Sequence, residues 1–319
     1  MEPYFFIVGC PRSGTTLLQR IVDAHSATAV CPEIFWITHN VNSRKGPDLN
    51  GPIDASIVSE LLRHRRFAEL GIDPENLTRL VDGSSAVSCR KFLEGVFELH
   101  GKSQRKQMVG NKTPQYVQNI LQFHNHWPNT KFIHLIRDGR DVCLSILNWK
   151  KADRTAGRFA TWLDDPVVTT ALWWKRNVQL GREAGKSLHP RLYCEIRYEA
   201  LVADPEGECR RLCDFLEIEF DPRMIHHHEA RSKDEVHPNA KSWKPITAGL
   251  RDWRTQMSQE QIEKFEAAAG DLLSELSYPR AFPNPSLQNR KHISALFDRF
   301  TSDVRSTGKL LPAQWELAN

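Results

Sequence analysis

Two glycines near the start of the chain have the spacing of a phosphate-binding loop. Residues 9–16 read Gly-Cys-Pro-Arg-Ser-Gly-Thr-Thr, which matches G-x-x-x-x-G followed by two further residues. A loop of this kind turns backbone N–H groups and the first turn of a helix toward an anion. A tight strand-to-helix turn that binds nothing is the alternative. The Gly-Thr-Thr sequence directly after an apolar run favours anion binding.

The charge in this loop differs from that of a loop that binds nucleoside triphosphates. Thr15 stands where such a loop has lysine, and the positive charge comes earlier, from Arg12. Kinases need that lysine and Mg²⁺ to neutralise the γ-phosphoryl group. A sulfuryl group carries less negative charge, so its transfer needs less neutralisation and no metal. The loop therefore favours a 5′-phosphosulfate over ATP.

A second candidate anion site begins at Arg137. The preceding residues 131–136, Lys-Phe-Ile-His-Leu-Ile, are an apolar run typical of a buried strand. Arg137 would then lie at the carboxyl end of a strand, where open α/β sheets bind ligands. Ser145 follows on the expected next helix. A solvated Arg-Asp-Gly-Arg-Asp loop is the alternative.

Both candidate sites lie in segments that resemble a known family. Residues 11–18 (Pro-Arg-Ser-Gly-Thr-Thr-Leu-Leu) are similar to the 5′-phosphosulfate loop of sulfotransferases that use 3′-phosphoadenosine-5′-phosphosulfate (PAPS), and residues 134–145 resemble that family's 3′-phosphate motif. Further similar blocks, all in the family's order, lie at 110–114, 197–205 and 249–254. Arg12 and the Cys-Pro-Glu sequence ending at Glu33 are closer to the tyrosylprotein and bacterial branch than to the cytosolic phenol and steroid branch.

The resemblance implies PAPS as the sulfuryl donor, adenosine 3′,5′-bisphosphate as the product, and no metal. Arg12 would reach the bridging and sulfuryl oxygens, and Arg137 with Ser145 would clamp the 3′-phosphate. The other residues with an implied donor contact are Ser13, Gly14, Thr15 and Thr16 in the first loop, Ser242 and Lys244 in a closing loop over 241–249, and Tyr198, for which a place in the core is an equal alternative.

Glu33 is the general base that the resemblance implies for an acceptor hydroxyl or amine. It follows the apolar run 27–31, so a helix out and a strand back could return it to the phosphate loop. A histidine is the fallback, with His39 nearest in the sequence and residues 226–228 next. Lys112 would stabilise charge on the leaving phosphate oxygen. A solvent-exposed lysine before a turn is its alternative.

Alternating strands and helices must position these residues. Apolar runs at 4–8, 131–136 and 191–198 predict buried strands, and each is followed by residues at helical spacing or by a helix start such as Asp204-Pro205. The alternation predicts an α/β fold with a P-loop-like central parallel sheet and helices on both faces.

The predicted sulfotransferase domain covers residues 1–279. Within it, residues 35–105 are expected to form a helical insertion on the acceptor side, and a C-terminal helical tail follows over 280–319. A stripe in this tail has helical spacing and is expected to pack on the body, with a homodimer contact as the alternative. Its members are Ile293, Leu296, Phe297, Phe300 and Val304.

The composition limits the compartment and the partners. The 319 residues carry 43 Lys+Arg against 39 Asp+Glu, a net +4 that is too weak to argue for nucleic-acid binding. The seven cysteines form no CxxC pair, which indicates reduced thiols and neither a disulfide scaffold nor a zinc site. No apolar stretch approaches the ~20 residues of a membrane span, and no secretory signal is recognisable. We therefore expect a cytoplasmic protein.

These observations predict a sulfotransferase that moves a sulfuryl group from PAPS to a hydroxyl or an amine. With no signal for export, the expected acceptor is a small molecule, a lipid or a glycan. The alternatives are a P-loop kinase that phosphorylates a small molecule with ATP and Mg²⁺, and a nucleotide-binding protein without catalytic activity.

Overall fold

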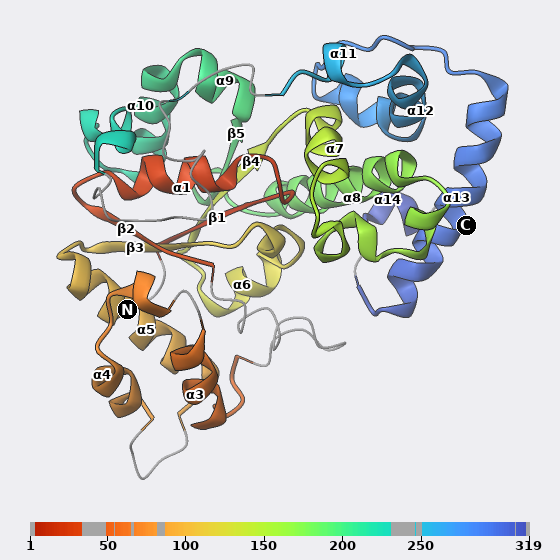
Figure 1. Cartoon of the computed structure of the whole chain (residues 1–319). Helices are drawn as coiled ribbons and strands as arrows, with labels where there is room; N and C mark the ends of the chain where they lie inside the picture. Colours follow the sequence, from red (N-terminus) through yellow and green to blue (C-terminus); the bar gives the residue numbers. More distant parts are fainter. Residues whose placement is uncertain are drawn as a thin grey trace.

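The computed structural model describes residues 4–33, 49–53, 55–64, 67–81, 87–230, 246, 251–309 and 311–316. At its centre, five strands run in the order β2-β3-β1-β4-β5, and every neighbouring pair is parallel (Figure 1). The strands are β1 (Phe5–Gly9), β2 (Thr28–Cys31), β3 (Met108–Lys112), β4 (Lys131–Ile136) and β5 (Tyr193–Arg197). The predicted parallel α/β sheet is thereby confirmed.

Side chains of the central strands alternate between two apolar layers. In β1, Phe5 and Ile7 join one hydrophobic cluster, whereas Phe6 and Val8 join another on the opposite face. All residues of β1 and β4 are buried, which requires helices on both faces of the sheet.

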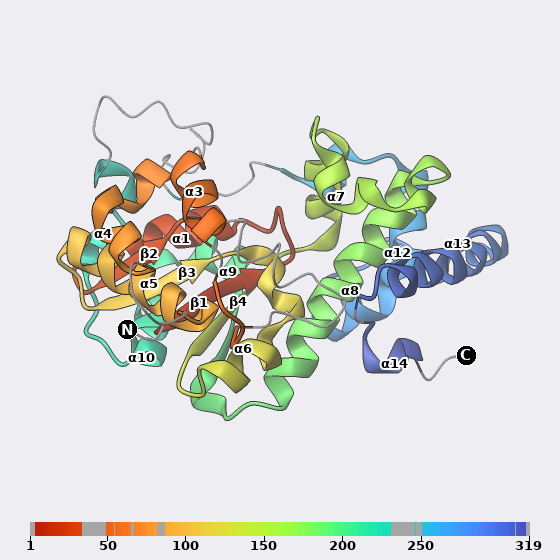
Figure 2. The same cartoon turned by 90° about the horizontal axis from the view of Figure 1, so that it is seen from below.

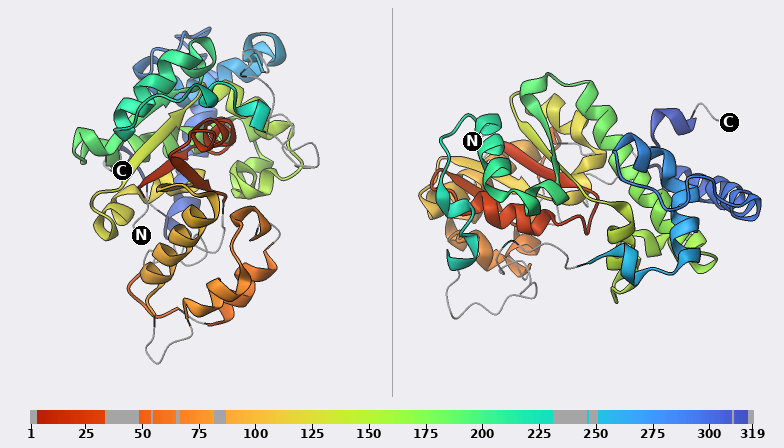
Figure 3. Two further views of the ribbon diagram at one scale, coloured as in Figure 1. Left: turned by 90° about the vertical axis from the view of Figure 1, so that its left-hand side faces the viewer. Right: turned by 90° about the horizontal axis from the view of Figure 1, so that it is seen from above.

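Helices cover both faces, as predicted. The face of Phe5 and Ile7 is covered by α1 (Thr15–Asp23), α9 (Tyr198–Ala203) and α10 (Pro205–Leu216). The other is covered by α5 (Cys89–Gln104), α6 (Ile120–His126) and the end of α8 (Pro166–Lys186), with α3 (Ala55–Arg63) and α4 (Pro74–Arg79) beyond α5. The left panel of Figure 3 shows α1 and α5 on opposite sides of the sheet.

The C-terminal segment from residue 253 onward joins α8 in a further hydrophobic cluster. It contains α11 (Trp253–Gln256), α12 (Gln259–Glu275), α13 (Leu287–Ser306) and α14 (Ala313–Glu316), which lie with α7 (Gly139–Leu147) at the end of the molecule opposite α3 and α4 (Figure 2). The predicted stripe of α13 packs in this cluster, so its packing on the body is confirmed. Among the described helices, none combines the length and the hydropathy needed to cross a bilayer.

Short 3₁₀ helices connect these elements. They are η1 (Phe67–Leu70), η2 (Pro114–Gln118), η3 (Ala152–Arg154), η4 (Ala156–Arg158), η5 (Ala160–Leu163), η6 (Pro190–Leu192), η7 (Pro222–Met224) and η8 (His227–Ala230). One of them corrects a predicted boundary: β5 begins at Tyr193 and not at Arg191, because Pro190 opens η6.

Strands β1 and β4 bring the two candidate anion sites together. Their pairing aligns Gly9 with Leu135, so the loop after β1 starts beside the segment that begins at Arg137. From β1 the chain continues through α1 to β2 on one side of the sheet, whereas from β4 it continues through α7 and α8 to β5 on the other. Open α/β sheets bind ligands where neighbouring connections diverge in this way.

Candidate functional site

The loop after β1 has a backbone conformation that favours glycine. The φ angles of Gly9, Arg12 and Gly14 are 155°, 77° and 102°, values that L side chains rarely adopt. At Gly9, a Cβ would lie 2.5 Å from the carbonyl oxygen of Leu135. Helix α1 starts at Thr15 with no side chain capping its first turn, so the first amide groups of the helix are available to bind an anion.

Two buried polar atoms at the candidate anion sites have no hydrogen-bond partner within the described ranges. They are the Oγ of Ser13 and the Nε of Arg137, whose residues are 0% and 4% exposed. Buried polar groups in folded proteins are nearly always paired. A ligand with acceptor oxygens at both ends would satisfy these two donors.

Arg137 is held from several directions at the end of β4. Its Nη2 donates to Oδ2 of Asp141 at 3.1 Å, and its guanidinium carbon lies 4.0 Å from the centre of the Tyr198 ring. The indole Nε1 of Trp174 donates to the carbonyl oxygen of Arg137 at 3.1 Å. These contacts hold the backbone and the guanidinium of Arg137, and its Nε has no partner among the described residues.

Arg12 reaches from the first loop to α7. Its Nε donates to Oγ of Ser145 at 3.0 Å, and its guanidinium carbon lies 4.7 Å from the centre of the Trp149 ring. Burial lowers the pKa of Arg12, and the positive charge of Arg251 lowers it further, against the influence of Glu33. Ser145 thus contacts the arginine of the first loop, and the two anion sites touch each other.

Tyr198 forms the boundary between the two sites. Its ring stacks on Arg137 and packs against Gly14, where a Cβ would lie 2.6 Å from the ring. Only 8% of the residue is exposed. The structure therefore gives Tyr198 a packing function, and its contact with a nucleotide stays a prediction.

Arg251 is a site residue that the sequence reasoning does not identify. Burial lowers its pKa, and the neighbouring Arg137 lowers it further. The block at 249–254 contains the signal, since it carries arginines in a segment similar to the family. Its spacing does not say whether Arg251 or Arg254 faces the site.

Trp253 anchors the segment that carries Arg251. Its backbone N–H donates to Oδ1 of Asp141 at 3.1 Å, and its ring centre lies 3.5 Å from the guanidinium carbon of Arg140. Asp141 also accepts from Arg137, so one carboxylate orients both the strand end and the later segment.

Glu33 and Lys112 form an ion pair beside α1. The Nζ of Lys112 lies 2.5 Å from Oε1 of Glu33 and 3.5 Å from Oγ1 of Thr16. Lys112 is buried, whereas 17% of the Glu33 side chain is exposed. Register explains the contact, since β2 and β3 pair Cys31 with Asn111 and so end together. The predicted path of a helix out and a strand back to the phosphate loop is confirmed.

A buried ion network supports the segment after Arg137. Arg140 is 0% exposed, and its guanidinium pairs with Asp138 at 2.7 Å and with Glu266 at 2.5 Å. The carboxylate of Glu199 accepts from the backbone N–H of Asp138 at 2.8 Å. Removing one partner of a buried pair costs about 3–5 kcal/mol, so this network holds the segment in one conformation.

The chemistry of the site follows from its charges. Among the residues that the structure describes, the cations are Arg12, Lys112, Arg137 and Arg251, and the carboxylates that contact them are Glu33 and Asp141. A surplus of guanidinium groups, which bind phosphate through paired N–H donors, suits a ligand with several negative charges. Glu33 contributes a carboxylate beside the phosphate loop through its ion pair with Lys112.

Some predicted residues are not part of this arrangement. Ser242, Lys244 and His39 lie outside the described residues. In η8, His227 is buried and lines a polar hollow with Arg20 and Asp23 of α1. Within the described ranges, no group of three His, Cys, Asp or Glu side chains is placed to hold a metal ion.

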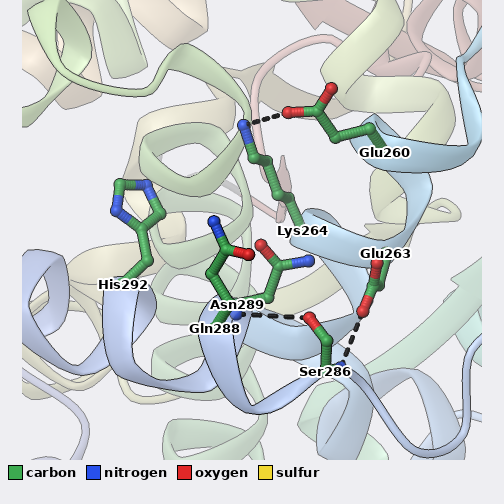
Figure 4. A pocket seen from close by; sticks show the side chains of 7 residues that line it. All are labelled: Glu260, Glu263, Lys264, Ser286, Gln288, Asn289 and His292. Atoms are coloured by element: carbon green, nitrogen blue, oxygen red, sulfur yellow. Dashed lines mark hydrogen bonds and ion pairs between the residues drawn. The ribbon is translucent and has the colours of Figure 1, made fainter.

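A second polar hollow, of about 400 Å³, lies between α12 and α13 (Figure 4). Its lining consists of Glu260, Glu263, Lys264, Ser286, Gln288, Asn289 and His292. Lys264 forms an ion pair with Glu260 within α12 at 2.7 Å. The backbone N–H of Ser286 donates to Oε1 of Glu263 and so connects the two walls. It shares no residue with the anion sites.

Comparison with known proteins agrees with this geometry. The model of a family described as the sulfotransferase family matches residues 3–222. Protein-tyrosine sulfotransferase A of Caenorhabditis elegans is 25% identical to this chain, with 98% of this chain and 75% of the relative covered.

Solved structures share the fold. The sulfotransferase domain of the curacin biosynthetic pathway matches with a TM-score of 0.57 and 20% identity, covering 88% of this chain and 99% of that domain. The sulfotransferase domain of a Synechococcus olefin synthase matches with a TM-score of 0.58 and 20% identity, covering 87% and 95%. The family model spans most of the chain and includes the phosphate loop, Glu33, Lys112 and Arg137. The chain therefore belongs to the sulfotransferase family and is a sulfotransferase.

Proposed function

We propose that this enzyme transfers a sulfuryl group from PAPS to the phenolic hydroxyl of a tyrosine in a polypeptide. The observation that carries the donor assignment is the direct contact of the two anion sites, through the hydrogen bond from Arg12 to Ser145. One nucleotide with phosphate groups on both its 3′ and 5′ positions fits such a pair of sites.

The donor would be held at both ends by residues of this chain. Residues 13–16 and the first turn of α1 would bind the 5′-phosphate, and Arg137 with Arg251 would bind the 3′-phosphate. The unpaired donors on Ser13 and Arg137 agree with this arrangement. We propose Ser242 and Lys244 as further contacts from the closing segment. PAPS supplies the sulfuryl group and leaves as adenosine 3′,5′-bisphosphate.

The acceptor side is built around Glu33. Its carboxylate would take the proton of the acceptor hydroxyl as the new O–S bond forms. Lys112 and Arg12 would neutralise the charge that develops on the phosphate oxygen as the old S–O bond breaks. The contact between Lys112 and Thr16 places this ammonium beside the phosphate loop, and no metal is needed in this scheme.

The relatives change the expected acceptor. The sequence alone favours a small molecule, a lipid or a glycan, whereas the relative that matches 98% of this chain is named a protein-tyrosine sulfotransferase. A phenol, with a pKa near 10, also gives up its proton to a carboxylate base far more readily than an alcohol does.

The test is an acceptor screen with PAPS labelled in its sulfuryl group. We expect label to appear on tyrosine-containing peptides and not on the same peptides with phenylalanine in place of tyrosine. Transfer to sugars or lipids but not to the peptides would show that the acceptor is a carbohydrate or a lipid and not a tyrosine. Turnover with ATP and Mg²⁺ but not with PAPS would support the kinase, and binding of adenosine 3′,5′-bisphosphate without any transfer would support a nucleotide-binding protein.

A further inference from the structure

The guanidinium group of Arg12 is held through its Nε and its contact with a ring, and its two terminal nitrogens have no hydrogen-bond partner among the described residues. Its Nε donates to Ser145 at 3.0 Å, and its guanidinium carbon lies over the ring of Trp149, 4.7 Å from the ring centre. Neither Nη1 nor Nη2 of Arg12 makes a hydrogen bond or an ion pair with a residue that the structure describes. The two terminal nitrogens therefore form a free fork on a group fixed at its other end.

Within the described part of the chain, the side chain of Trp149 makes no hydrogen bond and no ring contact other than the one with Arg12. It lies just after α7, its backbone N–H donates to the carbonyl oxygen of Ile146, and it is half-buried. Trp173 and Trp174 belong to the hydrophobic cluster around α8, but Trp149 does not. Its ring is thus explained by Arg12 and not by the packing of the core.

Arg12 needs such support for two reasons. An arginine side chain has about 2 kcal/mol of rotamer entropy to lose when it is fixed, and the nearby positive charge of Arg251 repels it. A tryptophan face attracts a guanidinium through the quadrupole of the ring, and it keeps the flat group in one plane.

We propose that Trp149 is a positioning residue, which holds the plane of the Arg12 guanidinium so that both terminal nitrogens face the 5′-phosphate of the nucleotide. This inference rests on the proposed function, because it assumes a nucleotide that carries a 5′-phosphate at the first loop. Preorganising the fork before the ligand arrives reduces the entropy cost of binding.

The test is a double-mutant cycle on the binding of adenosine 3′,5′-bisphosphate, measured by calorimetry. Trp149→Leu should raise Kd about threefold to tenfold, as expected for one cation–π contact, whereas Trp149→Phe should restore most of the affinity. In the Arg12→Gln background, Trp149→Leu should have no further effect. Trp162→Leu, the same truncation at another half-buried tryptophan, should leave Kd unchanged.

The outcomes separate this inference from the proposed function. Equal effects of Trp149→Leu in both backgrounds, or no effect in either, would overturn the positioning function, and thermal unfolding of each variant shows whether the fold is intact. If the cycle gives the expected coupling but the wild-type enzyme sulfates no tyrosine peptide, Trp149 keeps its function and the proposed acceptor is wrong.

Discussion

At the scale of single residues, the described part of the site holds more cations than carboxylates. Asp141 faces Arg137, and Glu33 faces Lys112, while no described residue forms a hydrogen bond or an ion pair with the terminal nitrogens of Arg12. Burial raises the pKa of Asp141, and the ion pair with Arg137 opposes this. The positive charge of these side chains suits an anionic donor. Of these two carboxylates, Glu33 is the one that contacts the phosphate-loop region through a lysine.

The base assignment predicts the behaviour of one conservative variant. Glu33→Gln should lower kcat about 10²-fold or more, since an amide cannot accept the acceptor proton, and it should leave the affinity for adenosine 3′,5′-bisphosphate near that of wild type. Single-turnover assays with labelled PAPS measure the first quantity and calorimetry the second. Glu206→Gln, on the exposed face of α10, is the matched control. Full activity of Glu33→Gln would show that a group other than Glu33 is the general base.

At the scale of elements, the sequence identifies the strands that are continuous apolar runs and misses the one that is not. β3 contains Gly110 and Asn111, which are poor strand formers. The reason for the glycine is tertiary: a Cβ on Gly110 would lie 2.2 Å from the ring of Phe5 on the neighbouring strand. The start of α7 at Gly139 likewise depends on one side chain, because the carboxylate of Asp138 caps the helix by accepting from the backbone N–H of Arg140.

The sequence also predicts only some of the residues of the candidate site. The motifs predict Arg12, Arg137 and Glu33 because each lies next to a recognisable strand. The stacking of Trp149 on Arg12 and the approach of Arg251 to Arg137 join segments more than a hundred residues apart, and no local pattern encodes them.

The boundary between the anion sites predicts a strong effect at Gly14. Gly14→Ala would place a Cβ 2.6 Å from the Tyr198 ring at a φ of 102°, so the ring must leave Arg137. We expect a loss of about 1–3 kcal/mol of stability and at least tenfold weaker nucleotide binding. Denaturant unfolding and calorimetry measure the two. Tyr198→Leu should relieve part of the stability loss in the double variant; equal penalties with and without the ring would contradict this packing.

A buried histidine in the sheet predicts that the stability of the protein depends on pH. His134 on β4 is fully buried, and burial lowers its pKa to about 3, whereas an unfolded histidine has a pKa near 6.5. Below pH 6.5 the unfolded chain therefore binds a proton that the folded chain does not, and the free energy of unfolding falls by roughly 2 kcal/mol between pH 7 and pH 5 through this site. Urea unfolding of His134→Gln should show a shallower decline; identical slopes would contradict the buried neutral imidazole.

At the scale of the whole molecule, the C-terminal tail shares a core with the catalytic part. Glu266 of α12 pairs with Arg140 near the donor site and also accepts from the backbone N–H of Phe282, at the start of the tail. Phe300 of α13 packs on Phe159 with ring centres 4.5 Å apart. The tail therefore contributes to the stability of the fold that carries the site.

This shared core predicts that two substitutions in α13 have very different effects on the free energy of unfolding. Phe300→Ala should lower the free energy of unfolding by about 3–5 kcal/mol, as for other buried aromatic side chains. Leu287→Ala, at a position of the same helix that is 67% exposed, should change it by less than about 0.5 kcal/mol. Urea titrations compare the two variants. Similar small effects would mean that α13 folds apart from the body.

The central claim is that the loop after β1 and the arginine after β4 bind the two ends of one nucleotide. The direct measurement is calorimetric binding of adenosine 3′,5′-bisphosphate and of adenosine 5′-monophosphate to the wild type and to Arg137→Ala. We predict that the wild type binds the bisphosphate at least about tenfold more tightly, as expected for one charge-assisted phosphate clamp, and that Arg137→Ala loses this preference while its affinity for the monophosphate is unchanged. Equal affinities of the wild type for the two nucleotides would contradict the claim.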